Sequence, residues 1–282
     1  MKTVYSINDT RDYIRRARAQ GRSIAFVPTM GNLHDGHLSL VKKAKELADE
    51  VVVSIYVNQL QFGPNEDYDS YPRTFEEDQA LLEALDVQLV FAPSSHEIYP
   101  EGAEHHTVVR VDALDGMHCG KSRPGFFTGI ATVVTKLFNI VQPDYAVFGE
   151  KDFQQLCIIR KMVNDLMLPV EIIGAPIARA ENGLALSSRN GYLSAEEKQT
   201  ASTLYQTLSA ARESIIAGDR NYDALHRDAF VKLARAGFKP DYFNIVSRHT
   251  LQPATLADKE LVILAAAALG RARLIDNIQI DL

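Results

Sequence analysis

The chain has 282 residues, of which 46% are hydrophobic and 23% are charged, and these proportions are typical of globular proteins rather than of disordered, collagenous or coiled-coil chains. Its 30 lysines and arginines and 36 aspartates and glutamates give a formal net charge of -6 without a block of like charge, which argues against general binding to nucleic acids or anionic membranes. We expect a cytoplasmic protein without a membrane span, because no segment approaches the roughly 18 apolar residues of a span and the N-terminus has no signal-peptide core.

The N-terminal part of the chain alternates short apolar runs with helical patterns. The runs at 24–27 and 51–57 are typical of buried strands, and apolar residues at helical spacing over 38–48 predict a helix between them. Strands that alternate with helices indicate a parallel, doubly wound sheet, so we expect an α/β fold with a Rossmann-like first domain. The same alternation predicts further helices over 75–85, 128–141 and 153–166 and further strands over 88–91, 145–148 and 170–173.

The pattern changes after Pro176, where helices come first and strands follow. Ser194 and Glu197 have the spacing of a capping box at the start of a long helix, and Gly237 is placed to end a second helix over 222–236. Runs of helices followed by runs of strands indicate a separate, smaller α+β domain. We expect a first domain over 1–176 and a C-terminal domain over 177–282, the latter with strands over 242–246, 260–266 and 272–280.

The two cysteines, Cys119 and Cys157, have no C-x-x-C partner, which fits a reducing compartment. His118 lies next to Cys119, but one histidine and one cysteine do not supply the four ligands of a structural zinc site. We therefore predict no resident metal site in this chain.

The segment 28–37, PTMGNLHDGH, follows the first of these predicted strands and opens the next helix. In a doubly wound sheet ligands bind there, beyond the carboxyl end of a strand, and free backbone N–H groups at the helix start favour phosphate. His34 and His37 lie three residues apart, so both side chains can reach one phosphate. The alternative is a pair of surface histidines. H-x-G-H marks the nucleotidyltransferases that act on the α-phosphate of ATP, and neither a P-loop nor a G-x-G-x-x-G motif occurs in the sequence.

Two further segments could supply charge to a phosphate, although each taken alone is also typical of a solvated loop. FGEKD at 148–152 ends another predicted strand, so Lys151 would meet phosphate as a mobile point charge, and Asp152 would cap the helix or help to hold a ribose or Mg2+. LSSRN at 186–190 carries two hydroxyls and a guanidinium that binds phosphate bidentately. Elsewhere, Gln61 and Gln155 are neutral amides that suit a small hydroxy acid.

With these segments in order along the chain, the sequence closely resembles the pantothenate synthetase family. The resemblance covers nearly the whole chain, and FGEKD together with SSRN is specific to that family among H-x-G-H proteins. It implies that ATP and (R)-pantoate form pantoyl adenylate and pyrophosphate, after which β-alanine attacks the activated carbonyl to give pantothenate and AMP. The matching segments are 28–31 with His34 and His37, 58–62, 71–74, 122–125, 148–155 and 186–190.

The resemblance also implies the roles of individual residues. His37 would donate a proton while His34 steadies the α-phosphate, and Lys151 and Arg189 would share in catalysis. Gln61 and Gln155 would hold pantoate, with Gln61 also near β-alanine, and Mg2+ would arrive with ATP. The family is usually dimeric, so we expect a homodimer, with the C-terminal domain closing over the active site. The implied ATP site comprises Met30, Gly31, Asn32, Leu33, His34, Asp35, Gly36, His37, Gly149, Glu150, Lys151, Asp152, Ala178, Leu186, Ser187, Ser188 and Arg189.

Two alternatives stay open beside this interpretation. The first is another H-x-G-H nucleotidyltransferase that acts on a different small substrate, although the Arg-Thr-x-Gly-Ile-Ser-Thr-Thr loop of many cytidylyltransferases is absent from the sequence. The second is a non-catalytic nucleotide-binding regulator, which could dispense with the paired histidines. The sequence does not show whether Arg123 or Phe126 contacts a ligand, which residues bind Mg2+, or where the dimer interface lies.

Overall fold

The computed structural model describes residues 1–64 and 66–282. Its internal contacts divide the chain into two compact units. The long third segment of unit 2 begins directly after Pro176, and two short stretches from earlier in the chain pack with it. Unit 1 comprises Met1–Gly116, Arg123–Glu150 and Gln155–Pro176, and unit 2 comprises Met117–Ser122, Lys151–Gln154 and Ile177–Leu282.

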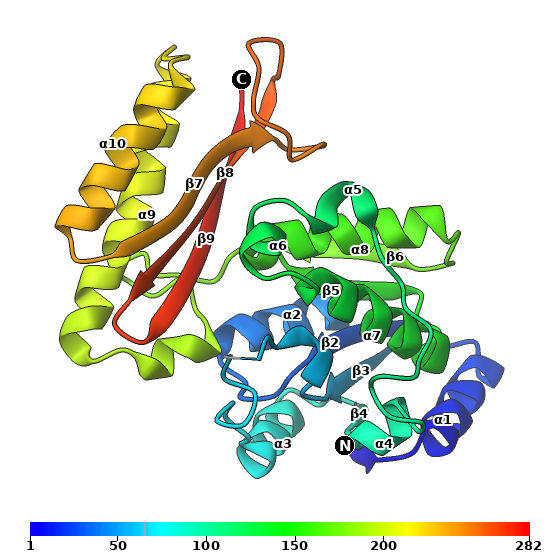
Figure 1. Ribbon diagram of the computed structural model, residues 1–282. Helices are drawn as coiled ribbons and strands as arrows, with labels where there is room; N and C mark the ends of the chain where they lie inside the picture. Colours follow the sequence, from blue (N-terminus) through cyan, green and yellow to red (C-terminus); the bar gives the residue numbers. More distant parts are fainter. Residues whose placement is uncertain (65) are drawn as a thin grey trace. The chain divides into compact units, whose positions relative to one another are not determined.

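Unit 1 contains a six-stranded sheet with the order β1-β4-β3-β2-β5-β6 (Figure 1), and each neighbouring pair is parallel. The predicted α/β, doubly wound fold is therefore confirmed. The strands are β1 (Lys2–Val4), β2 (Ile24–Thr29), β3 (Glu50–Ile55), β4 (Leu89–Phe91), β5 (Tyr145–Gly149) and β6 (Glu171–Ala175). The helices between them are α1 (Ile7–Ala19), α2 (Asp35–Leu47), α3 (Phe75–Ala84), α4 (Ser95–Ile98), α5 (Asp112–Asp115), α7 (Phe126–Val141) and α8 (Phe153–Asp165), with short 3-10 turns η1 (Gln59–Gln61) and η2 (Glu150–Asp152).

The strand order reverses beside β2, and this reversal decides where a ligand can bind. From β2 the chain adds β3 and then β4 on one side, and it later returns to place β5 on the other side of β2. Open parallel sheets bind ligands at such a switch point, outside the carboxyl ends of the two strands. β2 ends at Thr29 and β5 ends at Gly149, so the segments that follow these two strands begin at the same edge of the sheet.

Both faces of this sheet are covered by helices. Val41 and Ala44 of α2 and Leu82 of α3 are buried with Val27 and Val53 of the sheet in one apolar cluster. Phe138 of α7 packs edge-on against Phe26 and Phe148 of the sheet, with ring centroids 6.4 Å apart in each pair. Because both faces are buried, the strands consist of continuous apolar runs rather than alternating ones, which is why they could be recognised in the sequence.

The first strand and helix were not predicted from the sequence. β1 has only three residues, and α1 buries only Thr10, Ile14 and Ala17 of its 13 residues, so neither gives a strong apolar pattern. One local signal was present, since Ser6 caps the helix by accepting a hydrogen bond from the backbone N–H of Asp9 at 3.1 Å.

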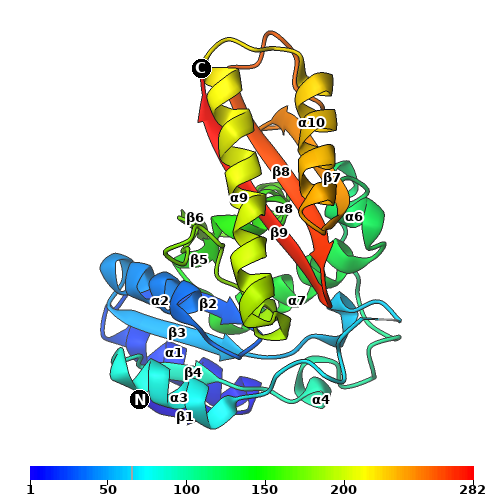
Figure 2. The ribbon, with the colours of Figure 1, turned by 90° about the vertical axis from the view of Figure 1, so that its left-hand side faces the viewer.

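Unit 2 pairs two long helices with an antiparallel sheet of order β7-β8-β9, as Figures 1 and 2 show. The predicted smaller α+β architecture and the capping box between Ser194 and Glu197 are confirmed. Gly237, with φ of 91°, directly follows the C-cap residue Ala236, as predicted. Its elements are α6 (Cys119–Ser122), η3 (Ser188–Tyr192), α9 (Ala195–Ile216), α10 (Tyr222–Arg235), β7 (Lys239–Ser247), β8 (Glu260–Leu269) and β9 (Ala272–Asp281).

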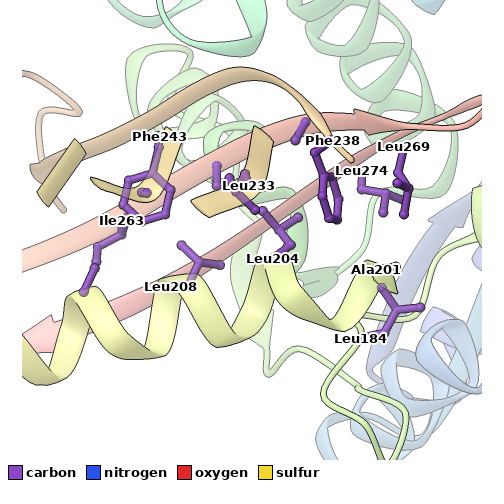
Figure 3. Packing of buried hydrophobic residues seen from close by; sticks show 14 of the residues in the cluster. Leu184, Ala201, Leu204, Leu208, Leu233, Phe238, Phe243, Ile263, Leu269 and Leu274 are labelled. Atoms are coloured by element: carbon purple, nitrogen blue, oxygen red, sulfur yellow. The ribbon is translucent and has the colours of Figure 1, made fainter. Parts of the chain in front are cut away.

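The two helices cover one face of the antiparallel sheet. Leu204 and Leu208 of α9 and Leu233 of α10 are buried against Phe243 and Ile263 (Figure 3). The cluster takes every second residue of β8 from Leu261 to Leu269, as expected for the face of a sheet that packs against helices. Among the described helices, none is long and apolar enough to cross a membrane.

The second face of this sheet is covered in part by Met117–Ser122, one of the stretches from earlier in the chain. A ring nitrogen of His118 lies 2.9 Å from the carbonyl of Leu251, and Cys119 Sγ lies 2.9 Å from the hydroxyl of Tyr242. Burial lowers the pKa of His118. These contacts give His118 and Cys119 a packing role in the second unit.

Candidate active site

The segment 30–37 follows β2 at the switch point of the sheet, and its two histidines lie together. The rings of His34 and His37 have centroids 4.2 Å apart, and His34 is the N-cap residue of α2. The backbone N–H of Gly36 donates to Nδ1 of His34 at 3.1 Å. A backbone amide can only donate, so Nδ1 is the acceptor and the neutral ring carries its proton on Nε2. His34 is thereby prepared to donate from Nε2.

Three backbone N–H groups of this turn, which the sequence suggested would be free for an anion, already have acceptors within the protein. The N–H of Asn32 donates to Oδ2 of Asp78 at 2.9 Å, and that of Leu33 donates to Oδ1 at 2.7 Å. The N–H of Gly31 donates to the hydroxyl of Thr29 at 3.2 Å. Because these amides serve the turn itself, an anion bound here would depend on side-chain donors more than the sequence suggested.

Asp78 is the residue that holds the turn, and the sequence analysis missed it. It lies on α3, is 1% exposed, and also accepts a hydrogen bond from the hydroxyl of Thr74 at 3.2 Å. A Cβ at Gly31, where φ is 78°, would lie 2.9 Å from Oδ2 of Asp78. Glycine is therefore required at position 31 both by backbone conformation and by the close approach of this carboxylate.

Gln61 lies in η1, which follows β3 at the same carboxyl edge, and Arg123 holds its main chain. Nη2 of Arg123 donates to the carbonyl of Gln61 at 3.0 Å, and Nε donates to Oε1 of Glu66 at 2.6 Å. The guanidinium also stacks on Phe126, with Cζ 3.6 Å from the ring centroid. The structure thus gives Arg123 and Phe126, whose roles the sequence left open, the task of fixing the backbone beside Gln61.

The helix α7 approaches η1 so closely that it needs a glycine. A Cβ at Gly129 would overlap the carbonyl oxygen of Leu60. Nδ2 of Asn58, which is 1% exposed, donates to the carbonyl of Gly129 at 3.2 Å. These contacts hold η1, and with it Gln61, close against α7.

Unit 2 carries a second group of predicted site residues. The hydroxyl of Ser187 caps η3 by accepting from the backbone N–H of Arg189 at 3.3 Å, and the backbone N–H of Leu186 donates to the carbonyl of Ala178 at 2.9 Å. Lys151, Ser187 and Asn190 line one small cavity. Lys151 and the segment that carries Ser187 are therefore brought together around one cavity within this unit.

The predicted site residues thus fall into two sets, one in each unit. Along the described parts of the chain, residues 1–64 and 66–282, no three His, Cys, Asp or Glu side chains gather in a way that could hold a metal ion. Unit 1 holds Met30 to His37, Gln61, Gly149, Glu150 and Gln155, and unit 2 holds Lys151, Asp152, Ala178 and Leu186 to Arg189.

The parallel sheet, its switch point and the paired histidines after β2 define an α/β protein of the H-x-G-H class. A family model described as pantoate-beta-alanine ligase matches residues 2–279. The chain belongs to this family, which makes it an amide-forming ligase of pantothenate biosynthesis.

Individual relatives agree over the full length of the chain. The pantothenate synthetase of Hahella chejuensis is 56% identical over 282 residues, which is 100% of both chains. The crystal structure of pantothenate synthetase from Thermus thermophilus is similar with a TM-score of 0.92 at 45% identity and covers 99% of both chains. A pantoate-beta-alanine ligase from Francisella tularensis, complexed with beta-gamma ATP and beta-alanine, has a TM-score of 0.79 at 35% identity and covers 99% of this chain and 97% of its own.

Proposed function

We propose that the protein condenses (R)-pantoate with β-alanine in two steps, with MgATP as the co-substrate and pantoyl adenylate as the intermediate. The observation that carries this proposal is the pair His34 and His37 at the switch point, with their rings 4.2 Å apart. Membership of the pantoate-beta-alanine ligase family supports pantoate and β-alanine as the two substrates that are joined. The ligands of the Francisella tularensis relative support ATP and β-alanine.

In the first step a carboxylate oxygen of pantoate attacks the α-phosphorus of ATP. The bond from the α-phosphorus to the bridging oxygen breaks, and pyrophosphate leaves with the electron pair. Negative charge grows on the phosphoryl oxygens, and donors aimed at that charge are what lowers the barrier. We assign this task to Nε2–H of His34 and to His37, which donates a proton or hydrogen bond, with Lys151 and Arg189 supplying charge to the phosphates.

In the second step the neutral amine of β-alanine attacks the acyl carbon of the adenylate. The bond from carbon to the phosphate oxygen breaks, AMP leaves, and the amine loses a proton as the amide forms. A free carboxylate is a poor electrophile, so the adenylate is what makes this attack possible. Gln61, whose main chain is held by Arg123, would orient the carboxylate that reacts in both steps.

The two glutamines give a prediction about substrate selectivity. Gln155 follows β5 in the first turns of α8 and belongs to unit 1, and we assign it to pantoate rather than to ATP. We expect Gln155→Ala to raise the KM for pantoate by about tenfold or more, since a neutral hydrogen bond contributes about 0.5–1.5 kcal/mol and leaves a polar partner unpaired. The KM for ATP should change by less than about twofold, as for contacts that are independent. Equal rises in the KM for pantoate and the KM for ATP would show that the assignment of Gln155 to pantoate is wrong.

The reaction itself is tested by following pyrophosphate and AMP in parallel. The protein is incubated with ATP, Mg2+ and (R)-pantoate, with and without β-alanine. We expect pantoate alone to release pyrophosphate, and we expect sustained release of AMP only when β-alanine is added. No pyrophosphate with pantoate, from a protein that still binds ATP, would favour an H-x-G-H nucleotidyltransferase that acts on another acid.

A further inference from the structure

Two adjacent polar residues of β9, Asp276 and Asn277, are buried in unit 2 and have no part in the reaction described above. They are 4% and 2% exposed, respectively. Neighbouring residues of a strand project to opposite faces of the sheet. Ala272 and Leu274, which share the face of Asp276, pack in the cluster with α9 and α10, so Asn277 projects to the other face.

Asn277 is bonded directly to the main chain of Lys151. Its Nδ2 donates to the carbonyl oxygen of Lys151 at 3.0 Å. Lys151 lies in the stretch Lys151–Gln154, which packs with unit 2 although it follows β5 in the chain. Fixing a backbone carbonyl limits where the attached Cα, and hence the lysine ammonium, can lie. Asn277 therefore sets the position from which Lys151 extends.

Asp276 holds the hairpin that precedes the Ser-Ser-Arg-Asn segment. Nη1 of Arg179 contacts Oδ2 of Asp276 at 2.6 Å, and Nη2 contacts Oδ1 at 2.9 Å. Nη1 also donates to the carbonyl of Gly183 at 3.0 Å, and Cζ lies 3.8 Å from the ring centroid of Tyr205. Arg179 forms a β-bridge with Ala185. The ion pair thus ties both arms of the hairpin to β9.

The bidentate geometry of this pair favours a role in positioning. Burial raises the pKa of Asp276, and the Arg179 guanidinium opposes this rise. A buried ion pair of this kind is often replaced by apolar side chains without loss of stability. What apolar side chains would not reproduce is the bidentate geometry, which fixes direction as well as distance.

We propose that Asp276 and Asn277 are positioning residues that hold Lys151 and the segment 186–189 in register for the phosphates of ATP. Asp276 and Asn277 project from opposite faces of β9, so this one strand fixes the positions of both segments. Lys151, Ser187, Asn190 and Asp276 line the same cavity, which shows that the segments held by β9 converge. This inference rests on the proposed ATP site.

A double-mutant cycle tests the proposal. We expect Asn277→Ala to raise the KM for ATP by about three- to tenfold, the effect of one lost hydrogen bond, and to leave the KM for pantoate unchanged. If Asn277 acts through Lys151, then Asn277→Ala should cause no further rise in the Lys151→Ala background. Asn277→Leu keeps the branched shape of the side chain and removes both polar groups of the amide, so it should behave like Asn277→Ala and is the variant to use if the alanine variant does not fold.

A matched control is Asn139→Ala, because Nδ2 of Asn139 also donates to a backbone carbonyl, that of Thr135 at 2.9 Å, but within α7. Asn139→Ala should leave both KM values unchanged. Equal rises for Asn277→Ala in the wild-type and Lys151→Ala backgrounds would overturn the proposal, as would an unchanged KM for ATP in folded Asn277→Leu. A Lys151→Ala variant with an unchanged KM for ATP would instead contradict the proposed ATP site, and the inference with it.

Discussion

Replacement of His37 by alanine is expected to lower turnover by about two to three orders of magnitude, the loss typical of one transition-state donor. His37 lies in the first turn of α2, where its backbone N–H donates to the carbonyl of His34 at 2.7 Å and its ring packs on that of His34. The loss should appear in kcat and kcat/KM alike, because a donor to developing charge acts mainly in the transition state. Steady-state release of pyrophosphate over a range of ATP concentrations, at saturating pantoate and β-alanine, measures both constants.

The control for this experiment is His105→Ala, since His105 is exposed on unit 1 and lies outside the switch point. Both variants should have the circular dichroism spectrum and thermal midpoint of the wild type. Near-normal turnover by folded His37→Ala would remove His37 from the catalytic role. A rise in the KM for ATP with unchanged kcat would make it a binding residue only.

The fold could be predicted from the sequence wherever the signal is local. Continuous apolar runs mark β2, β3 and β5 because both faces of the sheet are buried. The spacing of Ser194 and Glu197 marks the start of α9 because a capping box is formed by residues three apart. The H-x-G-H turn was likewise visible, since a strand, two glycines and a helix follow one another within the sequence.

The residues that support the site could not be predicted, because their partners are far away in the chain. Arg123 is 62 residues from Gln61, and Asn277 is 126 residues from Lys151. A carboxylate or amide in a helix or strand is usually a surface residue, so its type alone gives no signal. The sequence also suggested free amides in the turn after β2, and only the packing of α3 shows that a carboxylate already accepts from two of them, those of Asn32 and Leu33.

That carboxylate, Asp78, leads to the second large effect that we expect. Asp78→Ala leaves the partly buried N–H groups of Asn32 and Leu33 without their acceptor, and each unsatisfied group costs about 1–3 kcal/mol. We expect the free energy of unfolding to fall by about 2–6 kcal/mol, which urea denaturation measures as a lower midpoint with an unchanged m-value. Asp78→Asn keeps one acceptor oxygen at the same place, so its free energy of unfolding should fall by an intermediate amount.

The same substitution decides whether geometry or charge dominates at the turn. Removing a carboxylate near a phosphate site would by charge alone favour the anionic ATP, whereas releasing the turn would disorder His34 and His37. We expect geometry to dominate and the KM for ATP to rise by about tenfold, because hydrogen bonds to a charged group contribute about 1.5–3 kcal/mol each to holding the turn. Glu77→Ala is the matched control, since it removes an exposed carboxylate from the adjacent position of α3. A lower KM for ATP in Asp78→Ala would mean that repulsion by the carboxylate, not the order it imposes on the turn, is its main effect on ATP.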